Sequence, residues 1–185
     1  MKRHIRLNTP FETTDIPLSE YPRPQLERKS YLSLNGYWEY AIRDNKDIPS
    51  TFDGDILVPF SPESPLSGVN KFVKPNQYLF YRLNIDNLKE IDNDKIILHF
   101  TAVDQMAEVF VNDKFILKHV GGFLPFSFDV KPYLKEKDNT LIVRVKDYSD
   151  TSYYSRGKQK INRGGIWYTP QSGISLPVGA EGVSI

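Results

Sequence analysis

Short segments in which apolar and polar residues alternate are the feature that most restricts the fold of this chain. Residues 140–145 alternate cleanly, and residues 36–42 place Trp38 and Tyr40 on one face. Alternation with a period of two is typical of a β-strand with one buried face. The sequence contains no convincing amphipathic helical pattern and no repeat. It therefore predicts an all-β fold.

Turn signals separate several further segments of this kind. Asn112 and Asp113 tolerate left-handed backbone and are expected to close a hairpin, and Pro125 predicts an edge strand or a bulge. A charged hairpin is expected at residues 89–94 and one helical turn at 130–134. The Pro-rich and Ser-rich loop at 61–76 has a length that is often functional. The other expected strands are residues 56–58, 78–85, 96–101, 105–111, 115–117 and 123–130.

Length and composition suit one β-sandwich. The chain has 185 residues, of which 39% are hydrophobic and 13% aromatic. This size fits a single domain, and the aromatic and β-branched residues favour strands. Short strands between turns indicate two antiparallel sheets packed face to face. Periodicity alone does not separate a jelly roll from an immunoglobulin-like sandwich.

Several classes of function are disfavoured by charge and residue usage. The net charge is +1 without a basic block, so nucleic acid is not expected as a partner. The chain has no cysteine, which excludes disulfides. No secretion signal or run of about 20 apolar residues is present, so we expect a cytoplasmic protein that does not contact a membrane. Asp104, Asn112 and Asp113 carry oxygen ligands, but their spacing favours turns over calcium binding, and no metal or cofactor is expected.

The first 30 residues differ from the rest. Four prolines interrupt them at positions 10, 17, 22 and 24. Such a segment cannot form a helix or a central strand. We expect an extended arm over residues 1–30, lying on the sandwich formed by residues 31–185 or packing on a neighbouring domain or subunit.

Three motifs occur in a fixed order. Residues 98–112 read Leu-His-Phe-Thr-Ala-Val-Asp-Gln-Met-Ala-Glu-Val-Phe-Val-Asn, residues 121–130 read Gly-Gly-Phe-Leu-Pro-Phe-Ser-Phe-Asp-Val, and residues 164–174 read Gly-Gly-Ile-Trp-Tyr-Thr-Pro-Gln-Ser-Gly-Ile. Together with Asn-Gly-Tyr-Trp at 35–38, they resemble the N-terminal domain of glycoside hydrolase family 2. That family includes β-galactosidases, β-glucuronidases and β-mannosidases. The resemblance covers about residues 34–174.

The resemblance implies a jelly-roll β-sandwich, similar to galactose-binding domains, that precedes an immunoglobulin-like domain and a (β/α)₈ barrel. The two catalytic glutamates of the family belong to the barrel, about 5–5.5 Å apart, so no catalytic residue is expected in this chain. The implied function is to wall the pocket for a β-linked carbohydrate and to support the barrel, with β-galactosidase activity favoured for the parent and none for the domain alone. The alternatives are an autonomous carbohydrate-binding module and a purely structural domain. Homo-oligomerisation is left open.

The resemblance also directs attention to candidate substrate-binding residues near the third motif. Arg156, Lys158 and Gln159 can donate hydrogen bonds to sugar hydroxyls, or they belong to a solvated loop. Trp167 and Tyr168 can stack on the CH faces of a sugar ring, or they pack in the core or at a domain interface.

Two departures from the family pattern stand out. Several relatives carry an acidic residue six positions before Gly173 that reaches the sugar, and Trp167 occupies that position here. The segment after Ile174 lacks the two tryptophans that are usual in the family. Pro177 and Gly179 are expected to weaken the closing strand.

Overall fold

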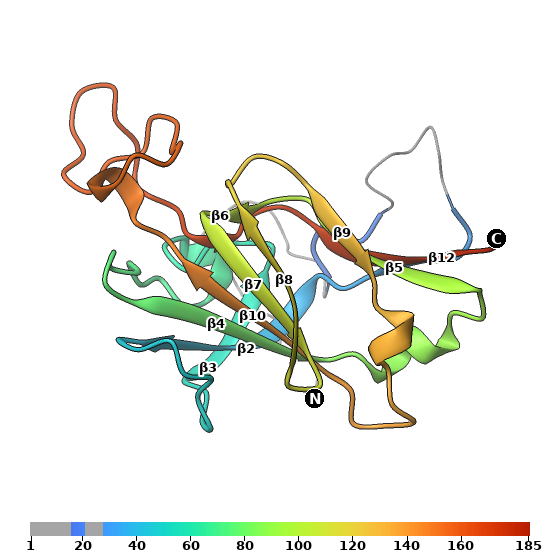
Figure 1. The fold of residues 1–185 in the computed structure, drawn as a ribbon. Helices are drawn as coiled ribbons and strands as arrows, with labels where there is room; N and C mark the ends of the chain where they lie inside the picture. The colour runs from blue at the N-terminus through green and yellow to red at the C-terminus, as the bar shows by residue number, and fades with distance from the viewer. Residues whose placement is uncertain (1–15, 21–27) are drawn as a thin grey trace.

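The alternating segments form strands whose apolar faces meet in one core. In the computed structural model of the chain, which describes residues 16–20 and 28–185, two antiparallel sheets pack as a sandwich (Figure 1). The six-stranded sheet has the order β3 (Gly54–Val58), β2 (Gly36–Arg43), β4 (Tyr78–Asn84), β10 (Thr140–Lys146), β7 (Met106–Val111) and β8 (Lys114–Val120). The four-stranded sheet has the order β1 (Tyr31–Ser33), β12 (Val178–Val183), β5 (Lys95–Phe100) and β9 (Phe126–Asp129).

The remaining elements are short. β6 (Val103–Asp104) and β11 (Gly173–Ile174) pair with each other. Single 3₁₀ turns are η2 (Pro65–Ser67), η3 (Asp86–Glu90), η4 (Lys131–Tyr133) and η5 (Ser149–Thr151). No helix in the described part of the chain is long and apolar enough to cross a membrane.

The core lies between the two sheets and is built from the buried faces that the alternation predicts. Trp38 and Tyr40 are 1% and 6% exposed on β2. The Trp38 ring meets Tyr81 edge-on at 6.2 Å between centroids, and its Nε1 donates to the Leu34 carbonyl at 2.8 Å. Strand β10 contributes Leu141, Val143 and Val145, which are all buried. The all-β sandwich is thereby confirmed.

Local predictions are confirmed at the hairpin, the edge strand and the helical turn. Asn112 and Asp113 adopt positive φ angles of 50° and 65° and connect β7 to β8. Strand β9 begins directly after Pro125 and lies at the edge of its sheet. The expected turn near residues 130–134 is η4.

The charged hairpin expected at residues 89–94 is wrong. Strands β4 and β5, on either side of it, belong to different sheets, and the connection contains η3. The physical reason is that Leu88 is fully buried, so the segment packs inward as it crosses between the layers.

The prediction of a weak closing strand is also wrong. β12 lies between β1 and β5 and pairs with both. Pro177 precedes the strand, where its carbonyl accepts from Thr101 N at 3.2 Å. Gly179 lies under Tyr31, because an added Cβ would stand 2.4 Å from the Tyr31 hydroxyl. Both residues therefore suit the strand.

Most of the arm expected over residues 1–30 lies outside the described residues. Within the described part, the Asn35 amide donates to the carbonyls of Pro17 and Leu18 at 2.9 and 3.1 Å. Arg28 pairs with Glu181 of β12 at 2.9 Å. These contacts connect both described pieces of the arm to the sandwich.

Candidate functional site

The loop that joins β10 to β11, residues 147–172, carries all five predicted substrate-binding residues. Figure 1 shows it projecting beyond the sheets, at the end of the sandwich away from the C-terminus. Apart from η5 and one isolated bridge, the loop has no regular structure. Its shape must therefore come from specific hydrogen bonds.

Backbone pairing brings the two predicted segments of this loop together. Tyr168 N donates to the Lys158 carbonyl at 2.8 Å, and Lys160 N donates to the Tyr168 carbonyl at 3.1 Å. Lys160 Nζ lies 5.3 Å from the centre of the Trp167 ring, within cation–π range. Lys158, Gln159, Trp167 and Tyr168 are thus neighbours.

Gln159 faces inward from this pair of segments. Its Nε2 donates to Asp104 Oδ2 at 3.2 Å, and its Oε1 accepts from Gln171 N at 2.7 Å. Both ends of the amide are occupied by the protein itself. These two bonds tie Gln159 to Asp104 and to the end of the loop, and so help to position the loop.

The other predicted residues lie at or near the surface. Tyr168 is 67% exposed and Trp167 is 36% exposed, so neither belongs to the core. Lys158 is exposed. Arg156 is half-buried, and its Nε has no hydrogen-bond partner among the described residues.

Beneath the loop lie three acidic residues, Glu63, Asp104 and Asp147, which we call the acidic cluster. Ser172 joins two of them: its hydroxyl lies 3.0 Å from Glu63 Oε1 and 3.1 Å from Asp147 Oδ2, and its backbone N donates to Glu63 Oε2 at 3.0 Å. Ser149 N donates to Asp147 Oδ1 at 2.6 Å. The cluster therefore holds the ends of the loop against the sandwich.

The electrostatics of the acidic cluster favour protonation. Burial, reinforced by the negative charge of Asp147, raises the pKa of Asp104 to about 7. Burial also raises the pKa of Asp147 and of Glu63 above their usual values. Asp104 is only 6% exposed, and an added Cβ at Gly122 would lie 2.4 Å from its Oδ1. The carboxyl is therefore enclosed by the fold, and its contact with Gln159 helps to hold the loop.

Sequence reasoning missed the acidic cluster. Glu63 and Ser172 are 109 positions apart, and no spacing rule connects them. Two signals were present: Ser172 belongs to the third motif, and Glu63 lies in the long loop at 61–76. Of the three residues considered for calcium, Asp104 and Asn112 flank opposite ends of β7.

A second loop, residues 121–125, adds apolar side chains to this end of the molecule. Phe123 and Leu124 are exposed, and the Phe123 ring lies next to Gly157 of the first loop. In the first loop Tyr153 is 89% exposed and Ile166 is 67% exposed. We call the following set the aromatic loop surface: Phe123, Leu124, Tyr153, Ile166, Trp167 and Tyr168.

Comparison with known proteins identifies the family. The model for the sugar binding domain of glycosyl hydrolases family 2 matches residues 67–170. A β-galactosidase of Thermoanaerobacter pseudethanolicus is 30% identical over 125 residues, which are 63% of this chain and 17% of that protein. A putative β-glucuronidase of Formosa agariphila is 33% identical over 153 residues, 75% of this chain and 17% of that protein.

The fold is also shared with solved structures. A β-glucuronidase from Ruminococcus gnavus superposes with a TM-score of 0.61 at 21% identity, over 88% of this chain and 30% of that one. The chain thus spans about a sixth of the length of the two curated relatives above. Since the family model covers more than half of its residues, the chain belongs to glycosyl hydrolase family 2, as the sugar binding domain of that family.

Proposed function

We propose that this domain forms one wall of the substrate pocket in a larger glycoside hydrolase, with its aromatic loop surface turned toward the catalytic domain. The observation that carries this proposal is the exposure of large apolar side chains on the two loops at one end of the sandwich. Grouped apolar side chains on a surface mark a site for a partner or a ligand. The acidic cluster supports the proposal, because it fixes the longer loop from beneath.

Within this surface the predicted residues take different roles. Tyr168 and Trp167 offer ring faces to the CH groups of a sugar. Lys158 and Arg156 supply donors to hydroxyl groups at the edge of the pocket. Gln159 acts through Asp104 and is a positioning residue.

We propose β-galactosides as substrates of the parent enzyme. Relatives named β-galactosidase support this choice. The alternative is a β-glucuronide, favoured by the two cations Arg156 and Lys158, which suit the carboxylate of a uronic acid. The chain by itself has no proposed catalytic residue, and we expect it to be inactive.

Hydrolysis assays test these statements. The chain and the longer protein that carries it are compared on nitrophenyl β-galactoside, β-glucuronide and β-mannoside. We expect turnover by the longer protein alone and fastest with the β-galactoside. Turnover by the 185-residue chain would contradict the proposed role, and preference for the β-glucuronide would select the alternative substrate.

A substitution in the longer protein tests whether the aromatic loop surface contacts the substrate. Tyr168→Ala should lower kcat/KM by about tenfold or more, the effect typical of an aromatic contact residue. Phe115→Ala is the matched control, because Phe115 is 51% exposed on β8, outside the aromatic loop surface. Equal effects of the two substitutions would argue against a sugar-facing role for Tyr168.

A further inference from the structure

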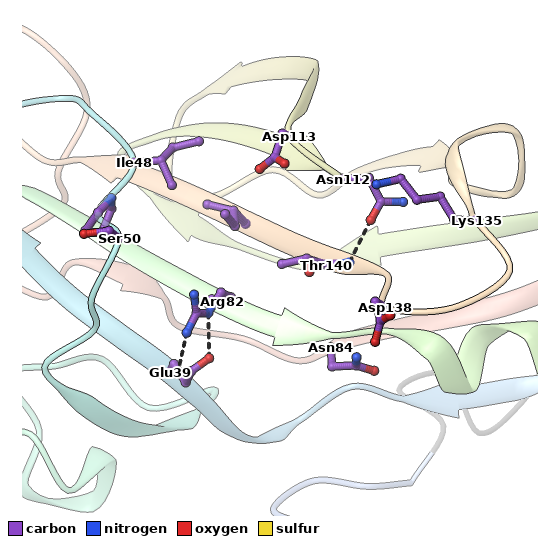
Figure 2. A pocket seen from close by; sticks show the side chains of 12 residues that line it. Glu39, Ile48, Ser50, Arg82, Asn84, Asn112, Asp113, Lys135, Asp138 and Thr140 are labelled. Carbon is purple, nitrogen blue, oxygen red and sulfur yellow. Dashed lines mark hydrogen bonds and ion pairs between the residues drawn. The ribbon is translucent and has the colours of Figure 1, made fainter.

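A polar hollow of about 420 Å³ opens on the outer face of the six-stranded sheet. Figure 2 shows side chains from the sheet and from its connecting loops converging on it. Its volume lies within the range of about 300–1,000 Å³ that small-molecule sites occupy. No residue of the loop at 147–172 lines it, so it is separate from the aromatic loop surface.

The floor of the hollow is a row of outward-facing side chains across three strands. Glu39, Arg82 and Ile142 are register partners on β2, β4 and β10. Arg82 Nε and Nη2 donate to the two Glu39 oxygens at 2.6 and 2.7 Å, and its guanidinium lies 4.0 Å from the centre of the Phe52 ring. Arg82 Nη1 takes no hydrogen-bond partner among the described residues, so it remains available as a fixed donor.

One wall is the loop between β2 and β3, which contributes Ile48, Pro49 and Ser50. Two contacts at its ends fix this loop. Arg43 Nη1 pairs with Asp53 Oδ1 at 2.7 Å, and Arg144 Nη1 donates to the Lys46 carbonyl.

The opposite wall is formed by two turns that a network of asparagines ties together. Asn112 Nδ2 donates to Asn139 Oδ1 at 2.9 Å, and the same oxygen accepts from Lys135 N at 2.6 Å. The side chains of Asp113, Lys135 and Asp138 are exposed at the rim, and in the described part of the chain they have no hydrogen bond or ion pair. The backbone of this wall is therefore held in place, while the charged groups of Asp113, Lys135 and Asp138 have no partner among the described residues.

We infer that this hollow is a second carbohydrate-binding site, which takes a neutral pyranose. Carboxylates accept hydrogen bonds from sugar hydroxyls, while Arg82 and Lys135 donate to them. The apolar side chains of Ile48, Pro49 and Ile142 match the CH faces of a ring. The hydrogen-bonded backbone of the walls lowers the entropic cost of binding.

The charge of the lining selects a neutral sugar. Three carboxylates, on Glu39, Asp113 and Asp138, face two cations, on Arg82 and Lys135, which leaves one net negative charge. A uronic acid would be repelled by this excess. The inference goes beyond the proposed function and does not depend on it, because the catalytic domain takes no part.

Titration of the ¹⁵N-labelled chain with D-galactose, D-glucose and D-glucuronate, followed by amide chemical shifts, tests the site. We expect saturable shifts at Ser50, Asp113, Lys135 and Asp138 with a neutral sugar, with a dissociation constant on the order of 1 mM. D-glucuronate should bind at least about tenfold more weakly.

The double variant Asp113→Gly/Asp138→Gly removes both free carboxylates. Its backbone should be preserved, because the φ angles of 65° and 58° suit glycine. We expect binding to weaken by about tenfold or more, as for the loss of charge-assisted hydrogen bonds. Asn70→Gly is the control, with the same type of backbone (φ 49°) outside the hollow, and it should bind as the parent chain does.

Lys135→Ala provides a second variant should the double variant fail to fold, since the Lys135 backbone N keeps its bond to Asn139. It should weaken binding as well. The inference is overturned if no saturable shift appears at these amides, if the variants bind as the parent does, or if D-glucuronate binds as tightly as D-galactose. Loss of binding in Tyr168→Ala would also overturn it, because the sugar would then occupy the aromatic loop surface.

Discussion

Asp104 is buried in the folded chain. In the unfolded chain, by contrast, its carboxyl is in water and is charged near neutral pH. The folded protein holds this proton up to about pH 7, whereas an unfolded aspartate releases it near pH 3.9. The folded state thus binds more protons between these values, so stability falls as pH rises through the window, and the loss is complete above about pH 7. Asp147 and Glu63 act in the same direction, because burial raises their pKa values too.

Asp104→Asn should therefore stabilise the chain at high pH. Asparagine has the shape of the protonated acid and has no proton to lose, so we expect a gain of about 1–3 kcal/mol at pH 8 that vanishes near pH 4. Urea unfolding at several pH values measures it. Asp113→Asn, an exposed aspartate at the β7–β8 turn, is the matched control. A difference for Asp104→Asn that is the same at every pH would contradict the argument.

Gly173 is the residue on which the β11 bridge depends. Its φ is +77°, and an added Cβ would lie 2.1 Å from the hydroxyl of Tyr81, a buried residue that accepts a bond from Ile174 N at 3.1 Å. Gly173→Ala should cost about 2–4 kcal/mol of unfolding free energy, from left-handed strain and overpacking together. Gly164→Ala should be nearly neutral, since nothing lies within 4 Å of its added Cβ. Thermal and urea unfolding measure the stability of both variants. Equal stabilities of Gly173→Ala and Gly164→Ala would refute the packing argument.

Sequence could indicate individual site residues but not which way their side chains turn. Tyr168 and Gln159 lie on two paired segments of one loop, yet the Tyr168 ring is exposed while the half-buried Gln159 side chain turns inward to Asp104. That difference arises from contacts to a strand 55 positions away, which local pattern does not encode. For Glu63 the sequence offered only its place in the long loop at 61–76, because its partner Ser172 is 109 positions away.

At the scale of elements, the strands themselves were predictable and their partners were not. Alternation located β2, β7 and β10, because one face of each strand points into the core. It gave no sign that β4 and β5 lie in different sheets. The strand β12 was misjudged because Pro177 and Gly179 reduce strand propensity, whereas in the fold Pro177 precedes the strand and Gly179 makes room for Tyr31. Tertiary packing overrides propensity here.

Removal of residues 175–185 tests this corrected view of β12. The deletion takes away the strand between β1 and β5 and the buried residues Val178 and Ala180. Cooperative thermal unfolding should be lost, because β1 would lose the strand it pairs with and β5 would keep only β9 as a partner. Removal of residues 184 and 185 alone is the control and should leave a cooperative transition. A cooperative transition in the longer deletion would show that β12 is dispensable.

On the scale of the whole molecule, two surfaces are set apart. The aromatic loop surface lies on the loops at one end of the sandwich, while the polar hollow lies on the outer face of the six-stranded sheet. One is apolar and fits a neighbouring domain or the faces of a sugar. The other is polar, rigid and slightly negative. The two proposals therefore assign a catalytic domain and a second sugar to separate surfaces.

The apolar character of the first surface predicts how the chain behaves when it is separated from a catalytic domain. Tyr153, Ile166 and Tyr168 expose most of their side chains, so the chain should bind an apolar dye such as ANS while remaining folded. The triple variant Tyr153→Ser/Ile166→Ser/Tyr168→Ser should lose most of this fluorescence and keep its melting temperature, because exposed side chains contribute little to stability. Phe115→Ser/Val120→Ser, on the exposed face of edge strand β8, is the matched control and should change the fluorescence far less. If the control removes the signal instead, the apolar docking surface is the edge of the six-stranded sheet, and the proposed orientation toward the catalytic domain fails.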